Sequence, residues 1–403
     1  MHTIALRQLR DASDCRIWYA CGMDPRNGAL DQPSRDASSV ALKRAVPKPH
    51  GLADGIAPPP TMRDIAHATG VSQSTVSRVL SGAPTTVPIA ERTRQRVLDA
   101  AKAVGYRPNP LARGLRGART MLLGVIVRDI TDPFFAGAIE AASVEASHHG
   151  YNVVLGHAHE SADEAVALWA VLEARHCDAI LFMGDLRDRP ALIEDLQNTR
   201  MPVVALWHGS RESGIPTVSV DNRAGISDVI DHLAALGHRR IAFAGRKRLG
   251  DIREREEAFL ASLEPHGLEQ MAAYLQDASN DFEGGAAALD RLMDLDEPPS
   301  AIVAPTDVIA IGMLHEAQRR GLRIPSDVSI SGFDDIPVAA FSVPALTTVR
   351  MPIEAMVRSA LDIAIDTLEG RLAIGADVHP LLGPELVVRA STGPPPTRAQ
   401  EGA

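Results

Sequence analysis

Four polar side chains are predicted to share the outward face of a short helix over residues 73–80. They are Gln73, Ser74, Ser77 and Arg78. Arginine and glutamine form paired hydrogen bonds with base edges, and short hydroxyls reach phosphate oxygens. The segment therefore indicates a helix that lies in the major groove of DNA.

Two helices joined by a tight turn must position these side chains. Thr61, followed three residues later by Asp64, predicts the N-cap of the first helix. Gly70 permits the turn that ends it, and Ser72 can cap the second helix. The residues expected to face inward are Ile65, Ala66 and Ala68 in the first helix, and Val76, Val79 and Leu80 in the second. Helix pairs of this kind occur in many folds, so the surrounding chain must decide.

Charge is distributed unevenly along the chain. The formal net charge is −10, but residues 61–119 contain 10 Lys and Arg against 3 Asp and Glu. Residues 120–403 contain 23 Lys and Arg against 42 Asp and Glu. A basic module attached to an acidic body is typical of a DNA-binding head on a sensor. The alternative, an ordinary solvated basic surface, accounts less well for so basic a segment.

Composition limits the class of protein. No apolar run reaches the roughly 18–20 residues needed to span a bilayer, and the first 25 residues lack the order of a secretory signal. Three cysteines are too few and too scattered for a disulfide framework or a metal site. We therefore expect a cytoplasmic protein without membrane association.

The amino-terminal part is predicted to contain three segments. Residues 1–60 show no sustained period and are interpreted as a disordered extension. A start codon assigned too far upstream would produce such an extension, and an interaction arm is the alternative. Residues 61–106 form the helix-turn-helix head, whose third helix, about 90–104, should pack through Val97, Ala101 and Val104. Residues 107–119 form a short basic hinge containing Leu115, which suits insertion into the minor groove. A flexible basic linker is the alternative for this hinge.

Short apolar strands alternate with amphipathic helices over residues 120–392, which predicts βαβ units and parallel sheets. Two such series of about 100 residues indicate an α/β body with two similar lobes and a ligand cleft between them. We place lobe 1 at about 120–221 and 351–378, and lobe 2 at about 222–350 and 379–392. Residues 393–403 are expected to form a disordered tail.

Several motifs together resemble those of the lactose-repressor (LacI) family of bacterial transcription regulators, whose body is similar to periplasmic sugar-binding proteins. The match runs from about residue 61 to 391. The motifs are GVSQSTVSRVL, AVGYRPN, ITDPFF, SVDNRAG, LGHRRIAFAG, GFDDIP and PALTTVRMP. The resemblance implies a ligand-responsive repressor that binds a near-palindromic operator as a homodimer.

The resemblance also assigns roles to individual residues. Gln73, Ser74 and Arg78 match positions that set operator sequence, and Leu115 matches a leucine that wedges into the centre of the operator. The remaining residues expected to contact DNA are Thr61, Ser72, Thr75, Ser77, Asn109 and Arg113. For the effector, Arg255 matches an arginine that grips ligand oxygens. The other expected effector-binding residues are Phe134, Phe135, Trp207, Asp221, Phe282, Thr306 and Asp334.

Two of these positions depart from the family pattern. Trp207 stands where many sugar-binding members have aspartate, and Thr306 stands where asparagine is usual. The resemblance implies a sugar, sugar acid or related metabolite as the effector, but a site with these departures should not hold a plain hexose. Arg255 with Trp207 would suit an acidic or ring-bearing ligand, such as a sugar acid or a small aromatic metabolite. Trp207 could equally be a core residue at the end of a strand.

Other chemistry is less well supported. His157, His159 and Glu160 lack an apparent further metal ligand, so we interpret them as a polar loop at the cleft mouth and expect no metal and no cofactor. The sequence contains neither a phosphate loop nor a nucleophile elbow. A transport-type solute-binding protein and a DNA-binding enzyme are the alternatives. The absence of a signal peptide weighs against the first, and the absence of a catalytic constellation weighs against the second.

Overall fold

The computed structural model describes residues 60–81, 88–106, 119–159, 161–174, 176–185, 190–208, 213–245 and 250–396. The predicted extension before residue 60, the hinge residues Asn109, Arg113 and Leu115, Glu160 and the chain end after 396 lie outside these ranges. Within the described part, no helix is both long enough and apolar enough to cross a bilayer.

The head consists of three helices around a small apolar core. They are α1 (Met62–Thr69), α2 (Gln73–Ser81) and α3 (Glu91–Ala103). Helix α1 begins directly after Thr61, and Gly70 takes a φ of 66° in the turn. Ser72 Oγ accepts a hydrogen bond from the backbone N–H of Thr75 (3.1 Å), which confirms the predicted cap. The buried core residues are Ile65, Val76, Val79, Val97 and Ala101.

Two expectations for the head core are wrong. Ala68 is exposed, and the buried residue at that end of α1 is Thr69, whose hydroxyl donates to the carbonyl of Ile65 (2.6 Å). Val104 is 41% exposed because α3 ends at Ala103, and Val104 is its C-cap. A threonine that satisfies its hydroxyl within its own helix can therefore be buried where periodicity predicts alanine.

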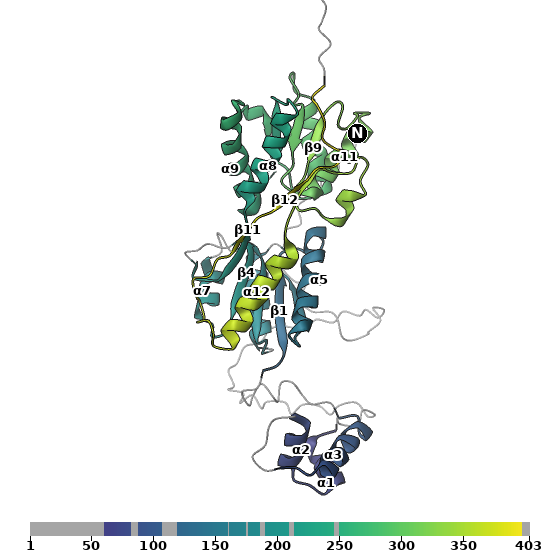
Figure 1. The fold of residues 1–403 in the computed structure, drawn as a ribbon, viewed down its shortest axis with the longest axis vertical. Helices are drawn as coiled ribbons and strands as arrows, with labels where there is room; N and C mark the ends of the chain where they lie inside the picture. The colour runs from purple at the N-terminus through teal and green to yellow at the C-terminus, as the bar shows by residue number, and fades with distance from the viewer. Residues whose placement is uncertain are drawn as a thin grey trace, which may run out of the picture. The chain divides into compact units, whose positions relative to one another are not determined.

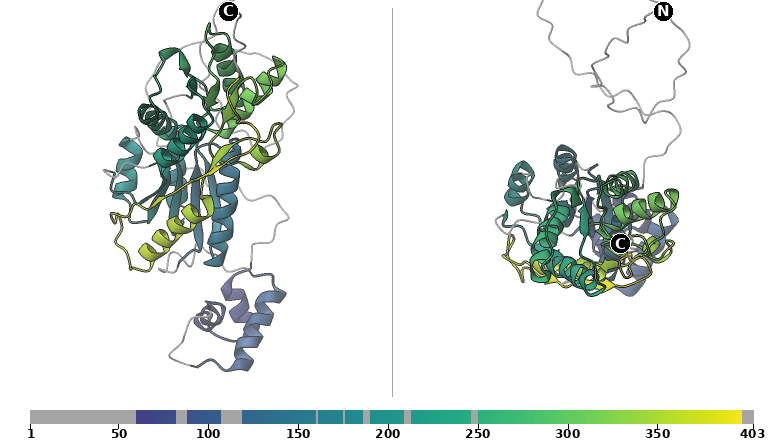
Figure 2. Two further views of the ribbon diagram at one scale, coloured as in Figure 1. Left: turned by 45° about the horizontal axis from the view of Figure 1, so that its top comes forward. Right: turned by 90° about the horizontal axis from the view of Figure 1, so that it is seen from above.

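The first lobe of the body is a six-stranded parallel sheet covered by helices on both faces. The strand order is β11-β5-β4-β3-β1-β2. Its strands are β1 (Leu122–Val127), β2 (Asn152–His157), β3 (Ala179–Asp185), β4 (Val203–His208), β5 (Thr217–Val220) and β11 (Leu381–Leu382). Its helices are α5 (Pro133–His148), α6 (Ala162–Ala174), α7 (Pro190–Asn198) and α12 (Ile353–Leu368). Helices α5 and α12 lie side by side on one face (Figures 1 and 2).

Strand β1 shows why these strands read as continuous apolar runs in the sequence. Val125 and Val127 belong to the core that includes α5 and α12, whereas Ile126 belongs to a separate core that includes α6 and α7. Successive side chains of a strand point to opposite faces, so a sheet covered on both sides needs apolar residues at every position.

The second lobe has a four-stranded parallel sheet in the order β7-β6-β8-β9. The strands are β6 (Ile241–Ala244), β7 (Leu275–Gln276), β8 (Ala301–Val303) and β9 (Ser329–Ser331). The helices are α8 (Asn222–Ala235), α9 (Gly250–Leu263), α10 (Phe282–Met293) and α11 (Asp307–Arg319). Short 3-10 helices are η2 (Glu264–His266), η3 (Ala272–Tyr274) and η4 (Pro337–Ala340). An antiparallel pair, β10 (Thr348–Arg350) with β12 (Glu385–Val387), lies at the crossings between lobes.

The structure corrects two boundaries near the chain end. Strand β11 pairs with β5, so Leu381–Leu382 belongs to the sheet of the first lobe, and the crossing to the second lobe falls after residue 382 rather than at 379. Gly393 accepts a hydrogen bond from His238 Nε2 (2.8 Å) and donates its N–H to Ser329 Oγ (3.1 Å). These contacts tie residue 393 to the second lobe, so the predicted tail does not begin there.

Helices α10 and α11 approach so closely that a glycine is required. A Cβ built on Gly285 would lie 2.1 Å from the carbonyl oxygen of Ile309 in the facing helix. We expect Gly285→Ala to lower the free energy of unfolding by about 1–3 kcal/mol or more, because backbone rather than a side chain must move. Urea denaturation checks this, with Gly137→Ala on α5 as the control, where the new Cβ meets nothing within 4 Å. Equal stability of the two variants would contradict the expectation.

Candidate functional sites

Helix α2 presents a polar face that matches the predicted recognition surface. Gln73, Ser74 and Arg78 are exposed, and Thr75 and Ser77 are half-buried. The Ser72 hydroxyl hydrogen-bonds the hydroxyls of Ser74 and Thr75, each at 2.8 Å. The first turn of the helix therefore presents a fixed group of hydroxyls, and Arg78 lies one turn further along. This arrangement suits phosphate contacts at the helix start and base contacts along its face.

A second candidate site is a cavity between the two lobes of the body. Its lining includes five residues that the sequence predicted for the effector site: Phe134, Trp207, Arg255, Thr306 and Asp334. The cavity holds about 20 Å³, room for a single water molecule. Pockets for drug-sized ligands are typically about 300–1,000 Å³. Occupation by a metabolite therefore requires the lining elements to move apart.

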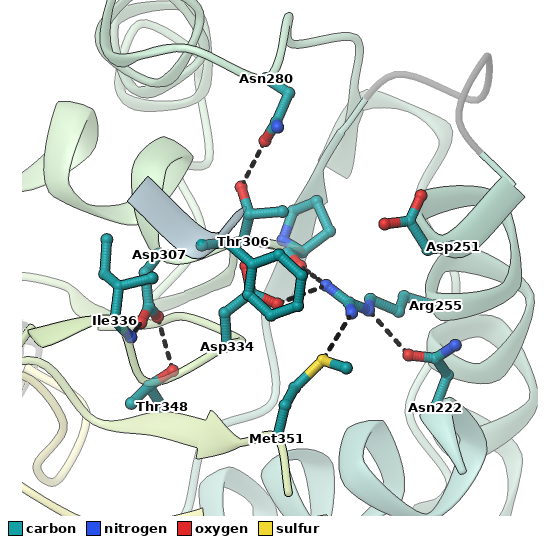
Figure 3. Close-up of polar contacts among 12 residues, drawn as sticks. Asn222, Asp251, Arg255, Asn280, Thr306, Asp307, Asp334, Ile336, Thr348 and Met351 are labelled. Carbon is teal, nitrogen blue, oxygen red and sulfur yellow. Dashed lines mark hydrogen bonds and ion pairs between the residues drawn. The ribbon is translucent and has the colours of Figure 1, made fainter. Parts of the chain in front are cut away.

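Arg255, on α9, is the central polar residue of the cavity. Its Nε donates to Asn222 Oδ1 (2.9 Å), and its Nη1 donates to the Pro305 carbonyl (2.5 Å) and to Asp334 Oδ1 (3.2 Å). Its Nη2 lies 3.4 Å from Met351 Sδ (Figure 3). The guanidinium carbon is 3.7 Å from the centre of the Phe333 ring. These contacts fix the buried cation between α8, the β8–α11 connection and the segment after β9.

Two aromatic residues, Phe134 and Trp207, line one side of the cavity, and Phe135 packs behind them. Phe134 and Trp207 meet edge to face with centroids 5.0 Å apart, and Phe135 packs against both. Trp207 lies near the end of β4 with a φ of 74°, and its indole N–H is buried without a hydrogen-bond partner among the described residues. Positive φ in a residue of this size is a strained conformation that occurs preferentially at ligand sites. Trp207 thus takes part in both the core and the cavity wall.

A chain of polar contacts joins the two lobes across the cavity. Thr306 Oγ1 donates to Asn280 Oδ1 (2.7 Å), and Asn280 Nδ2 donates to Asp132 Oδ2 (3.0 Å). Asp132 also lies 3.9 Å from Arg128 Nη2, whose other terminal nitrogen is 3.7 Å from Asp251. Asp132 and Arg128 belong to the first lobe, and the other three belong to the second. Opening the cavity must therefore separate charged and hydrogen-bonded groups.

Burial raises the pKa of three carboxyl groups around the cavity. The pKa of Asp334 lies well above its usual value because the group is desolvated, although Arg255 opposes this effect. Burial likewise raises the pKa of Asp132. Burial also raises the pKa of Asp307, directly behind Asp334, to about 7. The hydrogen bonds that its carboxyl group accepts from Thr348 Oγ1 (2.5 Å) and Ile336 N (2.9 Å) lower the pKa, but burial has the larger effect. Burial therefore favours the protonated, uncharged form of these carboxyl groups.

The raised pKa of Asp307 predicts a pH dependence of stability. The Asp307 carboxyl group binds its proton more tightly in the folded state than in the unfolded state. The folded state therefore loses stability as the pH rises from the pKa of this group in the unfolded state, about 3.9, to its pKa in the folded state. Between pH 4 and about 7, we expect the wild-type protein to lose stability relative to Asp307→Asn. Chemical denaturation of both proteins across this range tests it. A constant difference between them would show that Asp307 keeps an ordinary pKa.

Three predicted effector residues lie outside the cavity lining. Asp221 instead caps α8, accepting from the Ala224 N–H (2.9 Å). Phe135 is a core residue, 2% exposed. Phe282 is 45% exposed at the start of α10. The lining residues that were not predicted are Arg128, Asp132, Val220, Asn222, Asp251 and Met351.

The rings of His157 and His159 lie against each other with their centres 3.8 Å apart and their planes tilted by 39°. His157 Nε2 lies 3.5 Å from Asp129, and His159 hydrogen-bonds Glu164. No cluster of three or more potential metal ligands occurs within the described ranges.

A helix-turn-helix head and a two-lobed α/β body with an internal polar cavity define a ligand-responsive DNA-binding transcription regulator. Comparison with known proteins gives the family. Residues 61–109 match the model for bacterial regulatory proteins of the lacI family, and residues 230–392 match a periplasmic binding protein-like domain. The chain belongs to the LacI family.

Several relatives are similar along most of their length. The HTH-type transcriptional repressor CytR of Escherichia coli strain K12 is 34% identical over 334 residues, which cover 82% of this chain and 96% of the relative. The regulator reg1 of Streptomyces lividans is 34% identical over 346 residues, covering 83% and 97%. A Lac repressor dimer bound to operator has the same fold, with a TM-score of 0.75 at 24% identity over 83% of this chain and 100% of that one. These relatives are regulators rather than enzymes.

Proposed function

We propose that the protein is a repressor that binds a near-palindromic operator as a homodimer and responds to a small metabolite bound between the lobes. The observation that carries the proposal is the interlobe cavity, because Arg255 and its partners meet there from separate elements. The effector belongs to the sugars, sugar acids or related metabolites. The complex of the regulator CelR with cellobiose, 28% identical with a TM-score of 0.60, supports such an assignment; it covers 82% of this chain and 99% of that one.

The physical basis of the response is differential binding. A ligand shifts a conformational equilibrium only by the difference between its affinities for the two states. The cavity holds about 20 Å³, so a metabolite must favour a more open arrangement than the one described. In our proposal, that arrangement sets whether the two hinges and heads of a dimer can engage one operator together. Couplings of this kind are typically about 1–3 kcal/mol.

The DNA contacts follow the assignment made from the family resemblance. Gln73, Ser74 and Arg78 read base edges, and Ser72, Thr75 and Ser77 contact the backbone. Thr61, Asn109 and Arg113 are further DNA-binding residues. Leu115 enters the minor groove at the operator centre. The exposed polar face of α2 supports the first group.

Selection of bound fragments from the source genome tests the proposed function. The full chain should enrich a near-palindromic site beside transport or catabolic genes. A parallel selection with the chain starting at Thr61 tests whether the preceding residues alter binding. Failure of both forms to enrich any site would contradict the proposal.

Removing the hinge leucine should reduce DNA deformation. We expect Leu115→Ala to weaken operator binding and to decrease the bend, because partial unstacking of a base step requires an inserted apolar side chain. Energy transfer between dyes at the ends of an operator fragment measures the bend. Leu111→Ala in the same segment is the control. An unchanged bend with Leu115→Ala would exclude the wedge.

A further inference from the structure

The predicted hinge ends at Arg119, and one carboxylate of the first lobe holds the backbone that directly follows it. Asp178 Oδ1 accepts a hydrogen bond from the backbone N–H of Thr120 (2.8 Å), and Asp178 Oδ2 accepts one from the backbone N–H of Met121 (2.8 Å). The Thr120 hydroxyl lies 2.9 Å from Asp178 Oδ1 and 2.5 Å from the His176 carbonyl oxygen, so it can donate to either. Hydrogen bonds to an ionised acceptor are about twice as strong as neutral ones.

Asp178 is itself fixed by the sheet. It directly precedes β3, which pairs with β1, and its own N–H donates to the carbonyl of Leu122 at the start of β1 (2.8 Å). Thr120 is 5% exposed, and Met121 has a φ of 59°, a conformation that residues other than glycine seldom adopt. The path of the chain between the hinge and β1 is therefore determined by contacts to Asp178.

Arg119 connects the same point to α12. Its Nη2 donates to the carbonyl of Leu368, the last residue of α12 (3.0 Å), and its Nη1 lies 3.9 Å from Glu369. Carbonyls at a helix C-terminus lack partners within the helix and attract cations. Helix α12 begins shortly after Met351, which contacts Arg255 in the cavity, and it runs from the lobe crossing to the far end of the first lobe (Figure 1). One helix thus extends from the cavity to the end of the hinge.

We propose that Asp178 is a positioning residue for operator binding. Through Thr120 and Met121 it fixes the direction in which the hinge leaves the first lobe, and thereby the separation of the two hinges in a dimer. The inference rests on the proposed function, in which both hinges and heads engage one operator. One added base pair moves the half-sites apart by about 3.4 Å and turns them by about a tenth of a helical turn. A rigid hinge exit therefore selects one operator spacing, whereas a loosened exit tolerates several.

The test compares the operator selected by the unmodified chain with the same DNA carrying one base pair inserted at its centre. The ratio of the two affinities, measured by fluorescence anisotropy, is the spacing discrimination. Asp178→Ala should reduce this ratio at least about threefold, mainly by weakening binding to the unmodified operator. The matched control is Asp327→Ala in the second lobe, whose carboxylate also accepts from a backbone N–H, that of Arg323 (2.7 Å). It should keep the ratio of the unmodified chain, and an equal reduction in both variants would overturn the inference.

A pair of variants at Thr120 gives an independent measurement. Thr120→Ser keeps the hydroxyl near Asp178, and Thr120→Val replaces it with a methyl group of similar size. We expect the valine variant to lower the spacing discrimination and the serine variant to retain it. Unchanged discrimination in folded Asp178→Ala would overturn the inference. Where circular dichroism shows that Asp178→Ala is unfolded, the Thr120 pair decides, and equal ratios in the two would overturn it. Failure of the unmodified chain to enrich any near-palindromic site would instead refute the proposed function.

Discussion

Replacing Arg255 by alanine should abolish the response to the effector and destabilise the body. The substitution removes the cation that contacts Asn222, Pro305 and Asp334, and it leaves Asp334 buried beside other acidic groups. Breaking a buried ion pair by removing one partner typically costs about 3–5 kcal/mol. Denaturation monitored by circular dichroism measures the stability, and Trp207 fluorescence measures ligand binding.

Two further variants distinguish the loss of the buried cation of Arg255 from the loss of an arginine elsewhere. Arg358→Ala removes an exposed arginine that pairs with Glu145 at 3.6 Å, and it should change stability by about 1 kcal/mol or less. The double variant Arg255→Met with Asp334→Asn removes both charges and should recover much of the stability without recovering ligand binding. Unchanged ligand affinity in Arg255→Ala would refute the role given to this residue.

Replacing Arg78 by alanine should produce the largest loss of operator affinity in the head. A bidentate arginine–base contact contributes about 1–3 kcal/mol to discrimination, and a dimer would lose two of them. Arg78 is exposed on α2, and the core residues Val76 and Val79 flank it in sequence. The head should therefore keep its fold. Competition binding against operators with single base changes measures the affinity and the specificity.

The matched control is Arg96→Ala on α3, which removes the same charge at an exposed position. Loss of a phosphate contact weakens binding about uniformly across sequences, whereas loss of a base contact relaxes specificity at one position. We expect relaxed specificity for Arg78→Ala alone. Relaxed specificity in both variants, or in neither, would contradict base reading by Arg78.

The general architecture could be predicted because its causes are local. Apolar strands alternating with helices indicate parallel sheets, and Gly70 between two short helices indicates the turn of the head. Strand β11 has only two residues, and its pairing with β5 depends on contacts far apart in sequence. A pattern of two residues carries too little periodic information to assign it to a lobe.

The cavity lining was harder to predict because adjacent residues of one motif have different structural roles. In the SVDN motif, Asp221 caps α8, and it is the next residue, Asn222, that lines the cavity and contacts Arg255. A helix start offers an acidic side chain two uses, capping or ligand binding, and spacing alone does not distinguish them. Arg128 and Asp132 become visible as site residues only once the two lobes are placed against each other.

The most direct test of the central claim is the affinity of the full chain for its selected operator as the metabolite of the adjoining operon is added. Fluorescence anisotropy of labelled operator should show at least about a fivefold change in affinity at saturating metabolite. Arg255→Ala should keep the operator affinity of the metabolite-free protein and lose the change. Operator affinity that stays constant at concentrations that saturate the cavity would contradict the coupling between the cavity and DNA binding.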